Sequence, residues 1–173
     1  MKVSWAVFLL LCVASWAPGK ANAYCLGLDK LLPNYDPEYY SVSHEFKRTK
    51  YVIAASVLSQ TWVGEDGKET DLNPPFLNGS PSPRGFDPYL GAYYDVQVMR
   101  VFKGRPEPRL RLFSENSTGR FSLAVGAQYL LFVSDDTFDV IGEQLSVDSC
   151  GNSAPIENAE IVLRFVEKLY NAK

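Results

Sequence analysis

The sequence predicts a mainly β domain, a small antiparallel barrel or sandwich with a short helix before its strands and an amphipathic helix at its end. Three observations lead to this prediction. Five apolar or alternating segments are separated by turn residues, no alternation of strands and helices indicates parallel βαβ units, and the carboxyl-terminal segment changes to helical spacing.

The five predicted strands differ in the arrangement of their apolar residues. Residues 51–62 and 128–133 are apolar on both faces, as expected of strands that are buried on two sides. Residues 92–102 and 109–112 alternate between apolar and polar, which indicates one inward face and one solvated face. Residues 138–147 are predicted to form the fifth strand.

Helical patterns flank these strands. Residues 41–49, which include His44, predict a short helix that leads into the first strand. Near the other end, Ser153 is suited to cap a helix and Pro155 to occupy its first turn. We expect this second helix to pack across the barrel through the apolar residues that recur at helical spacing, namely Ile156, Ala159, Leu163, Val166 and Tyr170.

A long connection, residues 64–91, separates the first two predicted strands and holds five of the chain's eleven prolines. A connection of this length without regular structure is usually functional or disordered. It is too apolar for a solvated spacer, so it is expected either to cover the barrel or to form a recognition surface. Its large apolar side chains are Phe76, Leu77, Phe86, Tyr89 and Leu90.

The first 23 residues have the pattern of a secretory signal peptide: a positive start, an apolar run over residues 5–13 and a small-residue cleavage pattern that ends at Ala23. The apolar run is shorter than the roughly 20 residues that a membrane span needs. We therefore expect a single mature domain, residues 24–173, that is secreted or periplasmic and has no membrane span.

Loss of the signal peptide makes the chain more acidic. The peptide contains two lysines and no acidic residue, so the formal net charge moves from −3 to −5. This charge argues against nucleic acid or anionic lipid as the main partner. Residues 100–120 are mainly basic and residues 135–148 acidic, and we expect ion pairs between them worth less than about 1 kcal/mol each, with an acidic or glycan partner as the alternative.

Cleavage leaves two cysteines, Cys25 and Cys150. In an oxidising compartment such a pair most simply forms one disulfide. The bridge would close almost the whole domain, for which the chain-entropy model gives roughly 4–5 kcal/mol. One histidine and two distant thiols do not make a zinc site, so we expect neither a metal nor a cofactor.

The sequence has no recognisable catalytic set, because it lacks a nucleophile elbow, an HExxH pair and a phosphate-binding glycine loop. We interpret His44 as an ordinary helix histidine and Asp135-Asp136 as turn residues. The protein is therefore expected not to be an enzyme. The alternatives are a small extracytoplasmic hydrolase with a dispersed site around His44, or a structural envelope component.

Three short motifs follow one another in a familiar order. A strand ends in a Lys-Gly turn at Gly104, a Gly-x-x-Tyr-Leu strand follows at residues 126–130, and Cys150 comes after the last strand. This order resembles the netrin-like domains, the family that includes the tissue inhibitors of metalloproteinases. The resemblance covers roughly residues 25–151. It implies a five-stranded antiparallel OB-type barrel with helices beside it, and a cysteine that bonds back toward the amino terminus.

The matched residues also have physical reasons of their own. Gly104 is expected to supply φ freedom at a tight turn. Gly126 is expected to permit a close approach of backbone before a buried strand. Tyr129 is expected to place its ring in the core and its hydroxyl at the rim.

The resemblance implies a binding or inhibitor module that contacts another extracytoplasmic protein, such as a protease. Inhibitory members chelate the protease zinc with the amine and carbonyl of a cysteine that begins the mature chain. Here Tyr24 precedes Cys25, so chelation is not expected. We expect the contact surface to combine the amino terminus with the long connection, through Tyr24, Cys25, Leu26, Phe76, Leu77, Phe86 and Tyr89.

Overall fold

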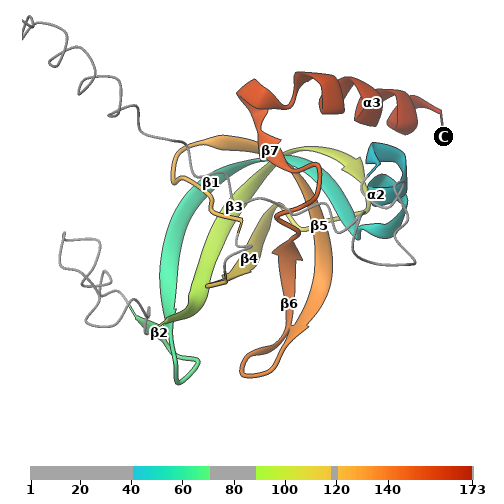
Figure 1. Ribbon diagram of the computed structural model, residues 1–173. Helices are drawn as coiled ribbons and strands as arrows, with labels where there is room; N and C mark the ends of the chain where they lie inside the picture. The colour runs from blue at the N-terminus through green and yellow to red at the C-terminus, as the bar shows by residue number, and fades with distance from the viewer. Residues whose placement is uncertain (1–40, 71–88, 118–120, 173) are drawn as a thin grey trace, which may run out of the picture.

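The computed structural model describes residues 41–70, 89–117 and 121–172. Its main feature is an antiparallel sheet in which five strands lie in the order β4-β3-β1-β5-β6 (Figure 1). Two short strands join it at its margins, β2 (Glu69–Thr70) on β1 and β7 (Ala154–Pro155) on β5. The five strands are β1 (Tyr51–Gly64), β3 (Tyr89–Lys103), β4 (Arg109–Glu115), β5 (Gln128–Phe138) and β6 (Gly142–Val147).

The sheet curls until its two end strands, β4 and β6, come near each other. They are not joined by a ladder of hydrogen bonds. Instead, the rings of Phe113 on β4 and Phe138 on β5 meet edge to face, with centroids 4.8 Å apart. The sheet is therefore a partly closed ring, and the prediction of a mainly β antiparallel fold with two helices is confirmed.

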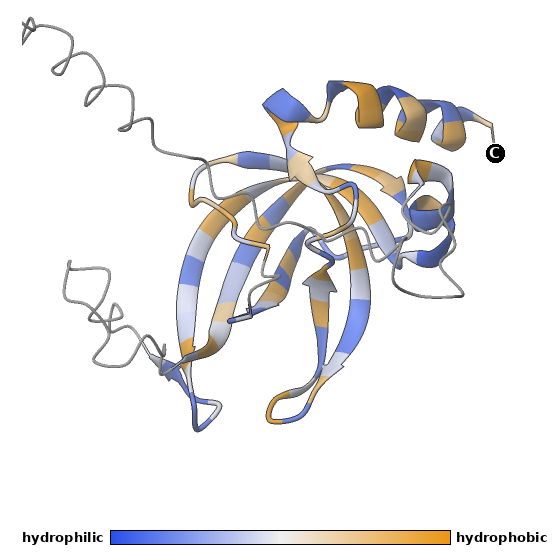
Figure 2. Cartoon of the chain, viewed as in Figure 1, coloured by the Kyte–Doolittle hydropathy of each residue, from blue (hydrophilic) through white to orange (hydrophobic). Residues whose placement is uncertain are grey.

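Strand β1 lies at the centre and packs on both faces. On the inner face of the curled sheet, Ile53 and Val57 belong to a core cluster with side chains from β3, β4 and β5. On the outer face, Val52 packs with Phe132 and with the two helices. Figure 2 shows the resulting mixture of apolar and polar residues along the strands. The prediction of burial on two faces is thus confirmed from Val52 to Val57, but not beyond, because Leu58 is 44% exposed.

Helix α2 (Val42–Arg48) confirms the predicted short helix. The Oγ of Ser41 caps it by accepting a hydrogen bond from the backbone N–H of His44, at 3.3 Å. Helix α3 (Glu160–Asn171) follows a 3₁₀ turn at Ile156–Asn158 and packs against α2 and β3. Within the described parts of the chain, no helix has the length and apolar character needed to cross a membrane.

The predicted start of the carboxyl-terminal helix was wrong. Ser153 does not cap it, because its Oγ accepts a hydrogen bond from the backbone N–H of Phe132 at 2.9 Å. Pro155 lies in β7, opposite Tyr129. The chain is thus held against β5 here, and α3 begins only after Ala159.

The prediction that Asp135 and Asp136 lie in a turn was also wrong. Both belong to β5, which continues to Phe138 and pairs with β6 over this whole stretch. The fifth predicted strand accordingly begins at Gly142 rather than at Phe138. The polar residues after Val133 indicated a turn, but they continue β5 and pair with β6 in the more exposed part of the β5–β6 hairpin.

The predicted connection 64–91 is shorter at both ends. Gly67 lies in a tight turn that leads into β2, and β2 pairs back onto β1. At the other end β3 begins at Tyr89, which pairs with Gly64. Residues 71–88 lie outside the described residues. Whether this segment covers the barrel or forms a recognition surface therefore stays a prediction.

The expected ion pairs between the basic segment 100–120 and the acidic segment 135–148 are not found in the described structure. The basic residues pair elsewhere: Arg100 with Glu167 at 2.7 Å, and Arg111 with Glu69 at 2.7 Å. The acidic residues pair with the region around α2: Asp135 with Lys50 at 2.6 Å, and Asp148 with Arg48 at 3.3 Å. Although β4 and β6 approach each other, the basic side chain of Arg111 has its partner on β2, and Asp135 and Asp148 have theirs in or beside α2.

Two of the three motif residues have the expected structural roles. Tyr129 is buried, and its hydroxyl accepts a hydrogen bond from the backbone N–H of Ala124 at 2.9 Å. Gly104 has a φ of +83° in the turn after β3. Gly126 does not permit a close approach, because an added Cβ would meet nothing within 4 Å. Its φ of +84° is what favours glycine.

These two glycines predict different costs for the same substitution. Gly126→Ala should lower the free energy of unfolding by about 1–2 kcal/mol, the cost of a left-handed conformation for a residue with a Cβ. Gly104→Ala should cost at least about 1 kcal/mol more, because its Cβ would lie 2.7 Å from the carbonyl oxygen of Lys50. Urea unfolding of both variants measures this difference, and equal losses would contradict it.

Candidate functional site

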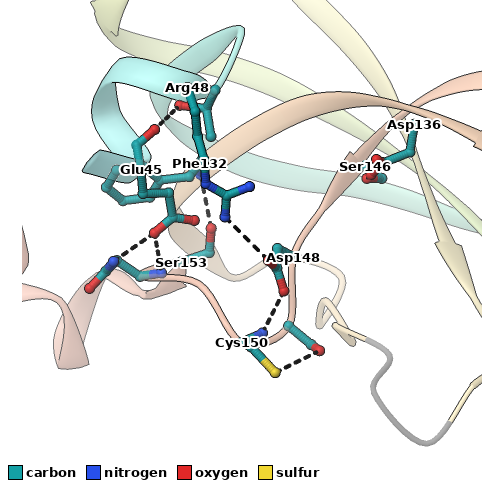
Figure 3. A network of polar contacts seen from close by, with 11 residues as sticks. Glu45, Arg48, Phe132, Asp136, Ser146, Asp148, Cys150 and Ser153 are labelled. Carbon is teal, nitrogen blue, oxygen red and sulfur yellow. Dashed lines mark hydrogen bonds and ion pairs between the residues drawn. The ribbon is translucent and has the colours of Figure 1, made fainter. Parts of the chain in front are cut away.

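A buried carboxylate joins helix α2 to the turn after β6. The side chain of Glu45 is fully buried. Its Oε2 accepts two hydrogen bonds from Asn152, one from the backbone N–H at 2.7 Å and one from the Nδ2 at 2.6 Å (Figure 3). Glycine at position 151 leaves space for this carboxylate, because a Cβ added there would overlap the Oε1 of Glu45.

The other oxygen of this carboxylate, Oε1, has no hydrogen-bond partner in the described structure. Burial raises the pKa of Glu45 above its ordinary value of 4.5. The hydrogen bonds from Asn152 and the positive charge of Arg48 oppose this rise, and the charge of Asp148 adds to it. The neutral acid is therefore easier to bury here than the carboxylate.

Further polar contacts hold the same turn in place. Arg48 of α2 pairs with the Oδ2 of Asp148 at 3.3 Å. The Oδ1 of Asp148 accepts a hydrogen bond from the backbone N–H of Cys150 at 2.9 Å. The position of Cys150 is thereby fixed relative to both α2 and β6 (Figure 3). Its expected partner, Cys25, lies outside the described residues, so the disulfide stays a prediction.

A cleft of about 320 Å³ opens beside this turn. One wall comes from the end of β4 and the other from β5, β6 and the turn after β6. We call it the β4–β6 cleft; the side chains that give it its character are Arg48, Phe113, Glu115, Asp136, Ser146 and Asp148. In the part of the chain that the structure describes, the lining combines aromatic rings with hydroxyl groups, three carboxylates and one basic side chain.

Alternation along the β5–β6 hairpin determines which side chains reach the cleft. Ser134 and Asp136 line it, whereas Asp135 between them pairs with Lys50 on the other side of the strand. Asp136 accepts a hydrogen bond from the hydroxyl of Ser146 on the neighbouring strand. This site was not among those predicted from the sequence. The pattern Ser134-x-Asp136 followed by Ser146-x-Asp148 was the available signal, because alternating polar residues share one face.

The cleft lies between the start of β3 and the turn that contains Cys150. Its β4 wall is close to the start of β3, since Glu115 pairs with Gly91. Its other wall reaches Ser149, the residue before Cys150.

Of the residues expected to contact a partner, the structure describes Tyr89. Its ring packs against Trp62, with centroids 5.7 Å apart, and the residue is half-buried in the sheet. This gives Tyr89 a structural role. The remaining expected contact residues, Tyr24, Cys25, Leu26, Phe76, Leu77 and Phe86, lie outside the described residues.

His44 lies half-buried in α2 and does not line the β4–β6 cleft. Its neighbour Glu45 points into the contact with Asn152 instead. Across the described residues, no cluster of three histidine, cysteine, aspartate or glutamate side chains could hold a metal ion.

The buried Glu45 predicts a pH-dependent difference in stability. Because its pKa is raised in the folded state, its contribution is fully present below the ordinary pKa near 4.5 and is lost as the pH rises through the raised value. Glu45→Gln keeps an oxygen for Asn152 but carries no charge. The variant should therefore gain stability relative to the native chain as the pH rises, by about 1.4 kcal/mol for each unit of the pKa rise.

Urea unfolding from about pH 4 to about pH 8 measures this relative gain. The matched control is Glu160→Gln, the same change on an exposed side chain that pairs with Arg164. Its stability relative to the native chain should stay nearly constant over this range. Parallel pH profiles for the native chain and Glu45→Gln would contradict the assignment.

A comparison with models of known protein families finds none that matches this chain, and a comparison with curated proteins finds no match. The netrin-like resemblance therefore depends on the three sequence motifs, and the function has to be argued from the geometry of the described residues.

Proposed function

We propose that the protein is an exported, non-enzymatic binding or inhibitor module of netrin-like type that contacts another extracytoplasmic protein. Its surface would consist of the amino terminus, the β4–β6 cleft and residues 71–88. The observation that carries this proposal is the position of the cleft: one wall lies near the start of β3, and the other ends beside Cys150.

The strand order supports the family part of the proposal. The path β4-β3-β1-β5-β6, with its two end strands near each other, is compatible with a five-stranded OB-type barrel that is left partly open. Helices α2 and α3 lie beside the sheet, as the resemblance implies. Gly104 and Tyr129, two of the motif residues, have the turn and core roles expected of them.

The fixed turn at Cys150 supports the position of the amino terminus. Asn152 is held by Glu45, and Asp148 is held by Arg48, so the turn has little freedom to move away from α2. A disulfide from Cys25 would attach Tyr24 and Leu26 to this rigid point. These residues would then border the β4–β6 cleft, where they could contact the same partner.

The disulfide can be tested by intact mass and amino-terminal sequencing of the secreted protein. We expect a chain that begins at Tyr24, weighs two hydrogens less than its reduced form and resists alkylation until a reductant is added. Cys25→Ser and Cys150→Ser should each lower the free energy of unfolding by about 2–5 kcal/mol, and the double variant should lose no more than either single variant. Alkylation of either thiol without reductant would contradict the bridge.

The function itself is tested by affinity capture from an extracytoplasmic extract with the immobilised full mature chain. We expect one stoichiometric protein partner that is lost when residues 73–88 are deleted. The control is Glu157→Gln, an exposed change on the 3₁₀ turn, which should retain the partner.

Two outcomes would replace the proposal with one of its alternatives. Capture of no specific partner would favour a structural envelope component. Activity profiling that finds a turnover abolished by His44→Ala would favour a hydrolase instead.

A further inference from the structure

We propose that the β4–β6 cleft receives a lysine or arginine side chain of the partner protein. This inference depends on the proposed function, since it names the chemistry of the partner at that surface. Three features of the cleft support it: its size, its uncompensated negative charge and its aromatic walls.

The size of the cleft suits one long side chain. Pockets that enclose drug-sized ligands have volumes of roughly 300–1,000 Å³, and this cleft, at about 320 Å³, lies at the lower limit. It opens between two strands that share no ladder of hydrogen bonds. A side chain can therefore enter from the surface without disrupting the pairing of the sheet.

The charge of the cleft favours a cation. Among the described residues, three carboxylates line it, on Glu115, Asp136 and Asp148, and Arg48 is the one basic residue. The guanidinium of Arg48 is already paired with Asp148 at 3.3 Å. Two negative charges therefore remain uncompensated by the lining, and a lysine or arginine side chain would complement them.

Asp136 differs from Asp135 and Glu69 in the kind of group that it contacts. Asp135 has Lys50 as its partner at 2.6 Å, and Glu69 has Arg111 at 2.7 Å. Asp136 accepts its hydrogen bond from a neutral hydroxyl, that of Ser146. Among the described residues no basic side chain pairs with it, so a cation bound in the cleft can make a charge-assisted hydrogen bond with its carboxylate.

The aromatic rings suit the remainder of such a side chain. Phe138, which is half-buried, lines the cleft and packs edge to face on the buried ring of Phe113. Phe121 lines it as well and packs against Tyr129, with centroids 6.1 Å apart. The methylene stem of lysine or arginine packs on such surfaces while its charged end reaches carboxylates, and arginine is enriched among residues that dominate protein interfaces.

The test is an NMR titration of the full mature chain with N-acetyl-arginine amide and N-acetyl-lysine amide. Saturable shifts are expected at the backbone amides of Ser134, Ser146 and Glu115. N-acetyl-norleucine amide, which has an apolar chain of similar length without the charge, is the matched probe and should bind more weakly. Equal binding of the charged and uncharged probes, or no shifts at the cleft, would overturn the proposal.

Two neighbouring aspartates supply matched variants. Asp136→Asn should weaken binding of the arginine probe about fivefold, the effect expected for one solvent-accessible charge pair. Asp135→Asn makes the same change in net charge one residue away, on the side of β5 that faces Lys50, and should leave binding unchanged. Equal effects of the two variants would show a general charge attraction and would overturn the proposal.

The same variants separate this inference from the proposed function. If the mature chain captures a partner and Asp136→Asn weakens the complex more than Asp135→Asn does, both are supported. If the two variants retain the partner equally, the cleft assignment is wrong while the binding function stands. If no partner is captured, the proposed function fails and with it the assignment of the side chain to a partner.

Discussion

The pairing of β1 with two partners along its length is the constraint on which the rest of the structure depends. It pairs with β3 from Val52 to Gly64 and with β5 from Tyr51 to Ser56. The first half of this strand also has both faces covered, by the inner cluster around Ile53 and the outer cluster around Val52, so a shift by one position would move residues out of both clusters. The register of β1 therefore fixes where β4 and β6 lie, because each is attached through one of its two partners.

The curl of the sheet follows from this arrangement and creates the cleft. The β1–β3 pairing contains several irregularities, which bend the strands and increase their twist. The two end strands then approach each other, and an aromatic contact between Phe113 and Phe138 closes part of the gap. Where the gap is not closed, polar side chains from strands far apart in the sequence meet. The candidate site thus exists because β4 and β6 do not pair and the sheet is not fully closed.

The buried carboxylate of Glu45 fixes the position of the turn after β6, at some cost in the stability of the fold. A fully buried carboxyl with one unpaired oxygen is unfavourable on its own, and this is the reason for its raised pKa. In return, its two hydrogen bonds to Asn152 hold the turn that contains Cys150. A more apolar contact would stabilise the fold without directing this turn, since apolar packing lacks the directionality of hydrogen bonds.

The sequence by itself determined the type of most elements, because periodicity reports how each segment is buried. The two-sided apolar run in β5 and the short helix within residues 41–49 were predicted correctly. In β3 the alternation holds at Tyr94 and Val96, but Phe102 packs in the outer cluster. Only the tertiary structure decided which segments meet. Ser153 bonds to β5 instead of capping a helix, and Asp136 and Glu115 line one cleft although twenty residues separate them. Local spacing indicates that Ser134 and Asp136 share a face of their strand, but it carries no information about the curl that brings β4 to this face or about the contact that buries Glu45.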